Sequence, residues 1–402
     1  MAKISSAKIR KIIDSRGNAT VEVDIFVDGK YMGRAAAPAG ASKGAFEVKD
    51  YPEEGIDFGI MQFRSVAIPK IVGSDPLDQK GFDKLLHEID GSDDFAVMGG
   101  NIAIATSLAV AKAAAKSEGM ELYRMMLKKG KAKMPYPVGN IIGGGKHAIN
   151  GTTMQEFLSV AFGKTYSDSA FANTIVHKRT GELLKKRFSD YPIGLGDEKA
   201  WVAAMGDMEA VQTLSDAISY TSEKTGMAMG PAIDLAASSF YADGMYDYKG
   251  RKLTTPEQIE FISGIVEKFS VKILEDPLDE NDFEGFAELT KRIGKKTIIV
   301  GDDLFVTNKK RLSQGIKMGA ANGVLIKPNQ IGTLSDMIET VELAKKHNYE
   351  MVISHRSGET EDSTIAHLAV GLGIGYIKTG TIGGERTAKH NELIRIEEME
   401  RA

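Results

Sequence analysis

Short apolar runs that each end in a polar residue recur through the second half of the chain. The runs are rich in Val, Ile and Leu, a composition typical of buried strands. Six successive ends lie 23 to 41 residues apart, about the length that one strand, one helix and two short loops require. These ends are Asp234, Glu275, Asp302, Lys327, His355 and Lys378.

Alternation of strand and helix at this spacing indicates a parallel sheet, and an earlier run, Pro192 to Glu198, extends the series. Seven such units predict a closed, TIM-like β/α barrel, which we place at residues 138–402. A doubly wound open sheet also fits the alternation. We favour the barrel because no glycine fingerprint opens the first unit and polar residues close nearly every run.

The first part of the chain has a different pattern. Apolar residues alternate with polar ones from Val21 to Val27, Asp28-Gly29 is a tight-turn signal, and the next residues can return antiparallel. Helical patterns follow at 79–90 and 100–128. We therefore expect an N-terminal α+β domain over residues 1–130, made of a three-stranded meander plus helices.

Composition narrows the function classes. The 402 residues carry a net charge of −4, which argues against nucleic acid or an acidic membrane surface as a partner. The absence of cysteine excludes disulfide and thiolate chemistry. The N-terminus lacks the apolar stretch of a signal peptide, and the most apolar segment, Ile102 to Ala115, is too short to span a bilayer. We read that segment as a buried helix and expect a cytoplasmic protein.

Three carboxylates close successive runs in the predicted barrel. The carboxyl ends of barrel strands meet at one face, so Asp234, Glu275 and Asp302 are expected to converge and to repel one another. A hard divalent cation relieves such repulsion, and oxygen ligands favour Mg²⁺ over zinc. The alternative is that each carboxylate pairs with a neighbouring lysine. Convergence of three consecutive strand ends favours the metal.

Two lysines, Lys327 and Lys378, would face that metal. A lysine that acts as a base near neutral pH must lose roughly three pKa units, or about 4 kcal/mol. A nearby dication and a second ammonium both act in that direction. Lysine and metal together provide what is needed to remove a proton next to a carboxylate and to stabilise the resulting ene-diolate.

The segment Ser354 to Gly358 precedes a stretch rich in helix-start residues. A helix N-terminus combined with Arg356 and Ser357 predicts a phosphate site. The glycine-rich segment Gly143 to His147 lacks the Ser or Thr that follows the lysine of a nucleotide-binding loop, so we do not read it as one. The remaining histidines show no metal-ligand spacing, and the final helix, 386–402, is expected to have a packing role only.

Four segments resemble the enolase family, and the match runs essentially end to end. Such long identities of unusual composition do not arise from fold constraints alone. The segments are Asp14–Asn18, Val300–Asn308, Leu325–Thr333 and Ser354–Asp362.

The resemblance implies an eight-stranded barrel that begins with an antiparallel pair. It also implies reversible dehydration of 2-phosphoglycerate to phosphoenolpyruvate in glycolysis and gluconeogenesis, with two Mg²⁺ per active site and a homodimer or an assembly of dimers. Enolase-superfamily sites are the known example of the pairing of a lysine base with magnesium described above.

The resemblance also assigns roles. Lys327 matches the base that removes the C2 proton, and Glu198, assisted by Glu156, matches the acid that helps to expel the C3 hydroxyl. Asp234, Glu275 and Asp302 match the ligands of the first metal, and Ser42 matches a mobile-loop ligand of the second. The matching substrate-binding residues are His147, Gln155, His355, Arg356, Ser357 and Lys378.

The chain departs from the family pattern after Glu198. The family usually has a glycine pair there, whereas this chain has Lys199-Ala200. We expect Lys199 either to lower the pKa of the acid or to change the loop.

Two alternatives to an enolase remain. The first is another enzyme of the enolase superfamily, which would share the metal ligands; such enzymes lack the Ser354–Ser357 phosphate segment and the loop that carries Ser42. A non-catalytic enolase-like binding protein is supported only by the altered loop.

Overall fold

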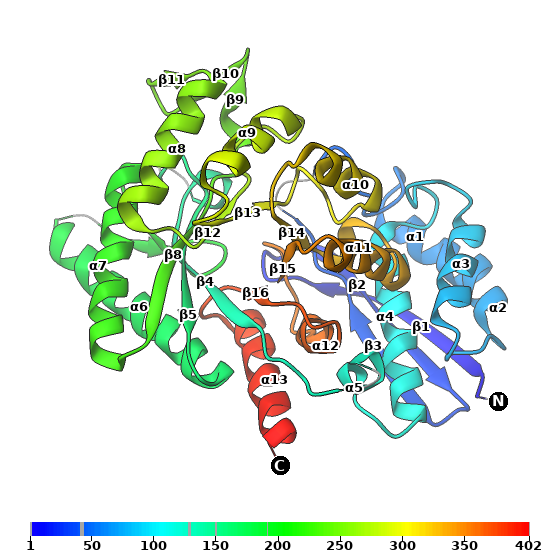
Figure 1. Cartoon of the computed structure of the whole chain (residues 1–402). Coiled ribbons are helices and arrows are strands. Elements are labelled where there is room, and N and C mark those ends of the chain that lie inside the picture. The colour runs from blue at the N-terminus through cyan, green and yellow to red at the C-terminus, as the bar shows by residue number, and fades with distance from the viewer. Residues whose placement is uncertain (1, 41–43, 128–129, 149–150, 191, 402) are drawn as a thin grey trace.

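The computed structural model of the chain describes residues 2–40, 44–127, 130–148, 151–190 and 192–401. The chain forms an N-terminal α+β unit followed by a barrel (Figure 1). The expected meander is present, with the strands in the order β1-β2-β3 and both pairings antiparallel. The elements of this unit are β1 (Ile4–Ile13), β2 (Ala19–Val27), β3 (Tyr31–Ala36), α1 (Ile56–Gln62), α2 (Ile68–Ile71), α3 (Gln79–Asp90), α4 (Gly100–Ser117) and α5 (Leu122–Leu127).

Helix α4 lies across β2 and β3 and is buried along almost its whole length. A helix that is apolar all round belongs in a core, so the prediction of a buried helix for this segment is confirmed. Gly33 in β3 permits the close approach, because a Cβ there would lie 1.9 Å from the carbonyl oxygen of Ala109. No helix in the described ranges is long and apolar enough to cross a membrane.

The second unit is a closed barrel of eight strands, because β16 pairs with β4 and completes the circle. Strand β5 runs antiparallel to both of its neighbours, and the other pairings are parallel. The barrel and its antiparallel start are confirmed, and the open sheet is excluded. The strands are β4 (Tyr136–Gly143), β5 (Glu156–Phe162), β8 (Ala228–Asp234), β12 (Ile273–Glu275), β13 (Ile298–Gly301), β14 (Gly323–Ile326), β15 (Glu350–Ser354) and β16 (Tyr376–Lys378).

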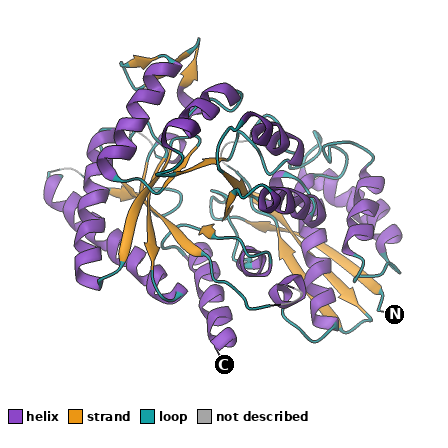
Figure 2. Cartoon of the chain, in the orientation of Figure 1, coloured by secondary structure: helices purple, strands orange, loops and turns teal. Residues whose placement is uncertain are grey.

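Helices surround these strands (Figure 2). A small apolar cluster fills the barrel interior, including Val160, Ile273 and Leu325, and forms the floor beneath the polar strand ends. A separate antiparallel sheet of β9 (Tyr241–Ala242), β10 (Met245–Asp247) and β11 (Lys252–Leu253) projects from one side. The helices are α6 (Tyr166–Arg187), α7 (Asp207–Thr225), α8 (Thr255–Phe269), α9 (Phe283–Ile293), α10 (Lys309–Met318), α11 (Leu334–Lys346), α12 (Thr364–Gly371) and α13 (Gly384–Arg401).

One detail of the predicted strands is wrong. The run Pro192 to Glu198 is not a barrel strand: it contributes β6 (Gly194–Leu195) to a short hairpin with β7 (Trp201–Val202), which pairs with β4. The run contains only two strand residues, both exposed, so it cannot serve as a buried barrel strand. Glu156 is the first residue of β5. Because β5 is antiparallel, its first residue lies at the same end of the barrel as the last residues of its neighbours.

The N-terminal unit covers that end of the barrel. Ala39 and Gly358 exchange backbone hydrogen bonds of 2.7 and 2.9 Å. On α4, Lys112 Nζ lies 3.2 Å from Asp362 Oδ2. These contacts hold the segment before residue 40 against the segment after β15, so side chains of both units face the same cavity.

The tight contact at Gly33 generates a stability prediction. Gly33→Ala should lower the free energy of unfolding by about 1–3 kcal/mol or more, because the backbone of α4 cannot yield to the new methyl group. Gly264→Ala in α8 is the matched control: its Cβ meets nothing within 4 Å, and it should raise the free energy by about 0.5–1 kcal/mol. Denaturant titration measures both. Equal effects of the two variants would contradict the proposed packing.

Candidate active site

The carboxylates predicted from the strand ends lie together. Glu156 on β5 and Glu275 on β12 are the register partners of Asp234 on β8, on its two sides. All three are buried, and the ammonium of Lys378 lies among them. Its Nζ is 3.0 Å from Glu156 Oε2, 2.9 Å from Asp234 Oδ2 and 2.7 Å from Glu275 Oε2.

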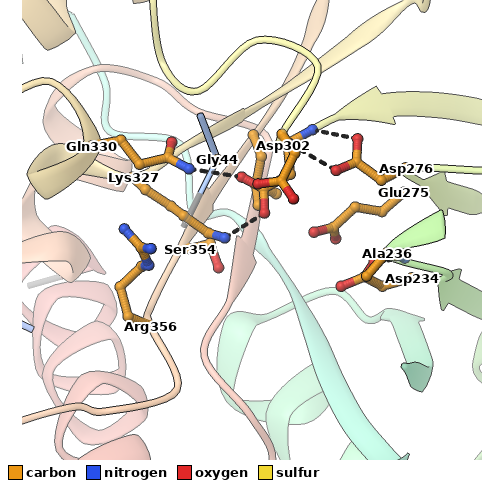
Figure 3. A network of polar contacts seen from close by, with 12 residues as sticks. Gly44, Asp234, Ala236, Glu275, Asp276, Asp302, Lys327, Gln330, Ser354 and Arg356 are labelled. Atoms are coloured by element: carbon orange, nitrogen blue, oxygen red, sulfur yellow. Dashed lines mark hydrogen bonds and ion pairs between the residues drawn. The ribbon is translucent and has the colours of Figure 1, made fainter. Parts of the chain in front are cut away.

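Asp302, directly after β13, extends this cluster toward Lys327 (Figure 3). The ammonium of Lys327 forms an ion pair with Asp302 Oδ2, and Gln330 Nε2 donates to Asp302 Oδ1 at 3.0 Å. The Asp276 carboxylate accepts hydrogen bonds from the backbone N–H groups of residues 302 and 303, at 2.9 and 2.7 Å. Ligand atoms of Asp276, Asp302 and Asp303 lie within 4.8 Å of one another.

Negative charge exceeds positive charge in this cavity. Among the described residues, seven carboxylates line it against two lysines and one arginine. Burial and the charge of Asp234 raise the pKa of Glu275 well above its usual value. Burial and Asp302 raise the pKa of Asp303 to about 7. Glu275 Oε1 is buried and has no hydrogen-bond partner among the described residues. An acceptor without a partner in a crowded anionic site fits a divalent cation.

The alternative prediction, that each carboxylate pairs with a lysine, is also met in this structure. Asp234 and Glu275 contact Lys378, and Asp302 contacts Lys327. Two ammonium groups do not balance the surrounding carboxylates. Burial lowers the pKa of Lys327, but Asp302 outweighs it, so the pKa lies above the usual value. As it stands in this structure, Lys327 holds its proton.

A second cluster contains the predicted acid. Glu198 Oε2 accepts a 3.0 Å hydrogen bond from Asn140 Nδ2 and lies 3.2 Å from His355 Nε2. His147 Nδ1 lies 3.3 Å from Glu156 Oε1, and the ligand atoms of His147, Glu156 and Glu198 are within 4.8 Å of one another. Burial acts to raise the pKa of Glu198, but the neighbouring His355 and His147 hold it well below its usual value.

The predicted phosphate-binding residues lie on the side of the cavity opposite Asp234 and Glu275 (Figure 3). Arg356 is buried and bidentate with Glu47, with Nη1–Oε2 at 2.9 Å and Nη2–Oε1 at 3.2 Å, and it donates to Asn329 Oδ1 at 3.0 Å. Ser357 is buried beside it. Ser42 lies outside the described residues. Gln155 Nε2 lies 3.5 Å from Asp234 Oδ2, so Gln155 belongs to the carboxylate cluster.

Sequence reasoning missed Glu47, Asn140, Asp276 and Arg386. Asp276 directly follows the predicted ligand Glu275, and this adjacency was a signal that could have found it. Glu47 lies in the N-terminal unit, Asn140 lies within β4 and Arg386 lies in the first turn of α13, so none of these three residues ends a strand. The structure brings the described site residues around one cavity, although Glu198 reaches it from a loop and not from a strand end.

Lys199, in the loop that carries Glu198, adopts a left-handed backbone conformation. Lys199 has φ +59°, the left-handed conformation that glycine adopts most easily. Its carbonyl oxygen lies 2.8 Å from His177 Nε2, and Trp201 Nε1 donates to the His177 carbonyl at 2.8 Å. The rings of His177 and Trp201 stack with centroids 5.4 Å apart. At the other side of the loop, Arg16 Nε lies 3.1 Å from Asp197 Oδ2.

The comparisons agree with this architecture. The family model described as "Enolase, N-terminal domain" matches residues 4–126, and "Enolase, C-terminal TIM barrel domain" matches residues 131–401. The enolase of Picrophilus torridus is 49% identical over 396 residues, 98% of each chain. That of Thermoplasma acidophilum is 48% identical over 395 residues, again 98% of each chain. That of Natronomonas pharaonis is 48% identical over 400 residues, 99% of each chain.

The conformation of Lys199 generates a second prediction. Lys199→Gly should raise the free energy of unfolding by up to about 1 kcal/mol, because relief of roughly 1–2 kcal/mol of left-handed strain exceeds the entropy that glycine adds to the unfolded chain. Turnover should not change, since the carbonyl that His177 holds is retained. Denaturant titration and an activity assay measure the two effects.

The comparison variant is His177→Ala, which removes the contact to that carbonyl and should lower turnover through loss of loop order. A Lys199→Gly protein that is less stable than the parent would show that the lysine side chain, and not its backbone, maintains the loop.

Proposed function

This chain belongs to the enolase family, and we propose that the cavity at the barrel end is the site where it binds its substrate. The activity is the reversible dehydration of 2-phosphoglycerate to phosphoenolpyruvate, a carbon–oxygen lyase reaction of glycolysis. The observation that supports this site best is the excess of buried carboxylates beside two lysines. Carboxylates, lysines and an arginine match a small anionic substrate that is held together with a metal.

We propose that the metal is Mg²⁺, with two ions per active site. Asp234, Glu275 and Asp302 would hold the first ion through oxygen ligands, a set that suits Mg²⁺, and Ser42 would bring the second. When bound, the metal neutralises the negative charge that develops on the substrate carboxylate as the C2 proton leaves. The unpartnered Glu275 Oε1 is the acceptor best suited to gain a partner in this way.

Lys327 is assigned the base role. In the dehydration direction its amine takes the C2 proton, the C2–H electrons form the C2–C3 double bond, and the C3–O bond breaks. Lys327 must first give up the proton that Asp302 stabilises. When Asp302 serves as a metal ligand, it stabilises the ammonium less, and burial then lowers the lysine pKa.

Glu198 is assigned the acid role, assisted by Glu156. Glu198 must first take up a proton, because the histidines beside it favour its carboxylate form. Once protonated, it supplies the proton with which the C3 hydroxyl leaves as water, and in the hydration direction it takes that proton back. Lys378 would bind the substrate carboxylate, and Arg356 and Ser357 would bind the phosphate. Arg356 would then exchange the Glu47 carboxylate for the phosphate, a stronger bidentate partner. His147, Gln155 and His355 would complete the substrate contacts.

The alternative of a non-catalytic enolase-like binding protein is not favoured. Its only support was Lys199, and the loop accommodates this residue in the conformation that glycine would take. We further propose residues 1–130 as a capping domain, 138–402 as the catalytic barrel, a cytoplasmic location, and a homodimer or an assembly of dimers.

Metal dependence is tested by assaying the purified protein with 2-phosphoglycerate and following the ultraviolet absorbance of phosphoenolpyruvate. Turnover should be lost with a chelator and restored by Mg²⁺. At one hundred times its dissociation constant, Mg²⁺ should stabilise the fold by about 2.7 kcal/mol. Glu275→Gln should lose this stabilisation, whereas Glu284→Gln, on the exposed face of α9, should keep it. Undiminished turnover in chelator would contradict the metal assignment.

The base role is tested with Lys327→Ala. Turnover should fall about 100- to 10,000-fold, the contribution expected of a general base. The increase in stability with Mg²⁺ should persist, because the proposed metal ligands remain. Lys317→Ala, at an exposed position of α10, is the control and should turn over normally. Normal turnover by Lys327→Ala would remove Lys327 from the mechanism.

A further inference from the structure

One fully buried cation reaches the site from the C-terminal helix. Arg386, in the first turn of α13, has no solvent exposure. Its Nη1 lies 2.7 Å from His355 Nδ1 and donates to the carbonyl of Arg356 at 2.6 Å. Its Nη2 donates to the carbonyl of Ser357 at 2.7 Å. The predicted role of this helix, packing only, therefore does not describe Arg386.

The turn between β16 and α13 is built around this side chain. Gly380 and Gly383 both have positive φ, +70° and +108°. A Cβ at Gly380 would lie 3.2 Å from Arg386 Cγ, and one at Gly383 would lie 3.5 Å from the same atom. The backbone therefore passes against the stem of the arginine, and this packing leaves the guanidinium little freedom to leave its three partners.

The chemistry of the two groups decides where the hydrogen of His355 sits. A guanidinium has only donors and is always charged. His355 Nδ1, in contact with Nη1, must therefore be the acceptor, so the single hydrogen of a neutral ring lies on Nε2. That nitrogen is 3.2 Å from Glu198 Oε2, close enough for an ion-pair contact although it makes no hydrogen bond among the described residues. The imidazole thus links the guanidinium on one side to the proposed acid on the other.

We propose that Arg386 is a positioning residue for the reaction: it fixes His355 as the neutral Nε2–H tautomer, so that the Nε2 hydrogen faces the Glu198 carboxylate. The same guanidinium holds the two carbonyls of the segment that carries Arg356 and Ser357. One buried arginine thereby sets the position of the acid and of the proposed phosphate-binding wall together. The catalytic meaning of this arrangement rests on the proposed function, but the tautomer does not.

The surrounding charges support the neutral ring. Burial, followed by the effect of Arg386 and Lys378, lowers the pKa of His355 to about 3 even though Glu198 acts to raise it. The ring is therefore uncharged at neutral pH. The charged and titratable groups that face Glu198 are His355 directly after β15, His147 from the loop after β4, Glu156 from β5, Lys378 from β16 and Arg386 from α13.

The test is the nitrogen NMR spectrum of the full chain with isotope-labelled histidine. The His355 signals are assigned by their loss in His355→Gln. In the parent protein at neutral pH, His355 should show a protonated Nε2 and an unprotonated Nδ1, with no titration between pH 5 and 8. A protonated Nδ1 or a charged ring in the parent protein would overturn the proposal, with no variant and no turnover measurement needed.

Arg386→Met removes the donor and keeps an apolar stem of similar length. In this variant His355 should show both tautomers and should titrate at higher pH, because the positive charge beside Nδ1 is gone. Turnover should fall by about 10- to 100-fold, as found when an outer partner that orients an active-site group is lost. Arg386→Lys keeps the charge and should show a smaller loss.

Glu385→Gln is the matched control. Glu385 Oε1 lies 3.3 Å from Arg386 Nε without a hydrogen bond, whereas His355 and the two carbonyls contact Nη1 and Nη2. Its His355 spectrum and turnover should equal those of the parent. An Arg386→Met protein that is folded, with an unchanged His355 tautomer and unchanged turnover, would show that the arginine only packs. If the parent protein shows no turnover but Arg386→Met changes the His355 tautomer, the proposed function is refuted and only the control of the tautomer by Arg386 stands.

Discussion

The structure depends on an excess of buried negative charge at one end of the barrel. Seven carboxylates share the cavity with two lysines and one arginine, and each ion removed from water without full compensation costs several kcal/mol. The raised pKa values of Glu275 and Asp276, both caused first by burial, show that this cost is not fully offset. A site that is under-neutralised by its own side chains weakens the protein alone and favours the binding of a dication.

Two features of the fold bring these charged side chains together. Parallel strands deliver Asp234, Glu275 and Lys378 to one end of the barrel, and the reversed strand β5 delivers its first residue, Glu156, to the same end. The N-terminal unit then covers the opening and contributes Glu47 to Arg356. Exclusion of water by this cover strengthens every charge interaction in the cavity. The two units therefore form one site.

Much of the convergence at the barrel end could be predicted from the sequence, because the residue that ends a buried parallel strand lies at the same end of the barrel as its neighbours. Asp234, Glu275 and Lys378 were found in this way. The direction of β5 could not be predicted from residues alone, since an apolar run does not reveal whether its strand is parallel or antiparallel to its neighbours. Glu47 and Arg386 were missed for another reason. They reach the site through contacts across 309 and 31 positions of the chain, and such pairings leave no periodic trace in the sequence.

Glu198 is positioned differently from the site residues on the barrel strands. The proposed metal ligands and lysines lie on or next to barrel strands, so the hydrogen-bonded ladder fixes their spacing. Glu198 lies on a loop, and its position depends on contacts from distant segments: Arg16 beside Asp197, His177 on the carbonyl of Lys199, and His355 on the carboxylate. Because these contacts engage backbone and neighbouring groups, the residue after the acid is free to vary. A lysine where the family usually has glycine is therefore compatible with an intact acid, at the cost of one strained dihedral angle.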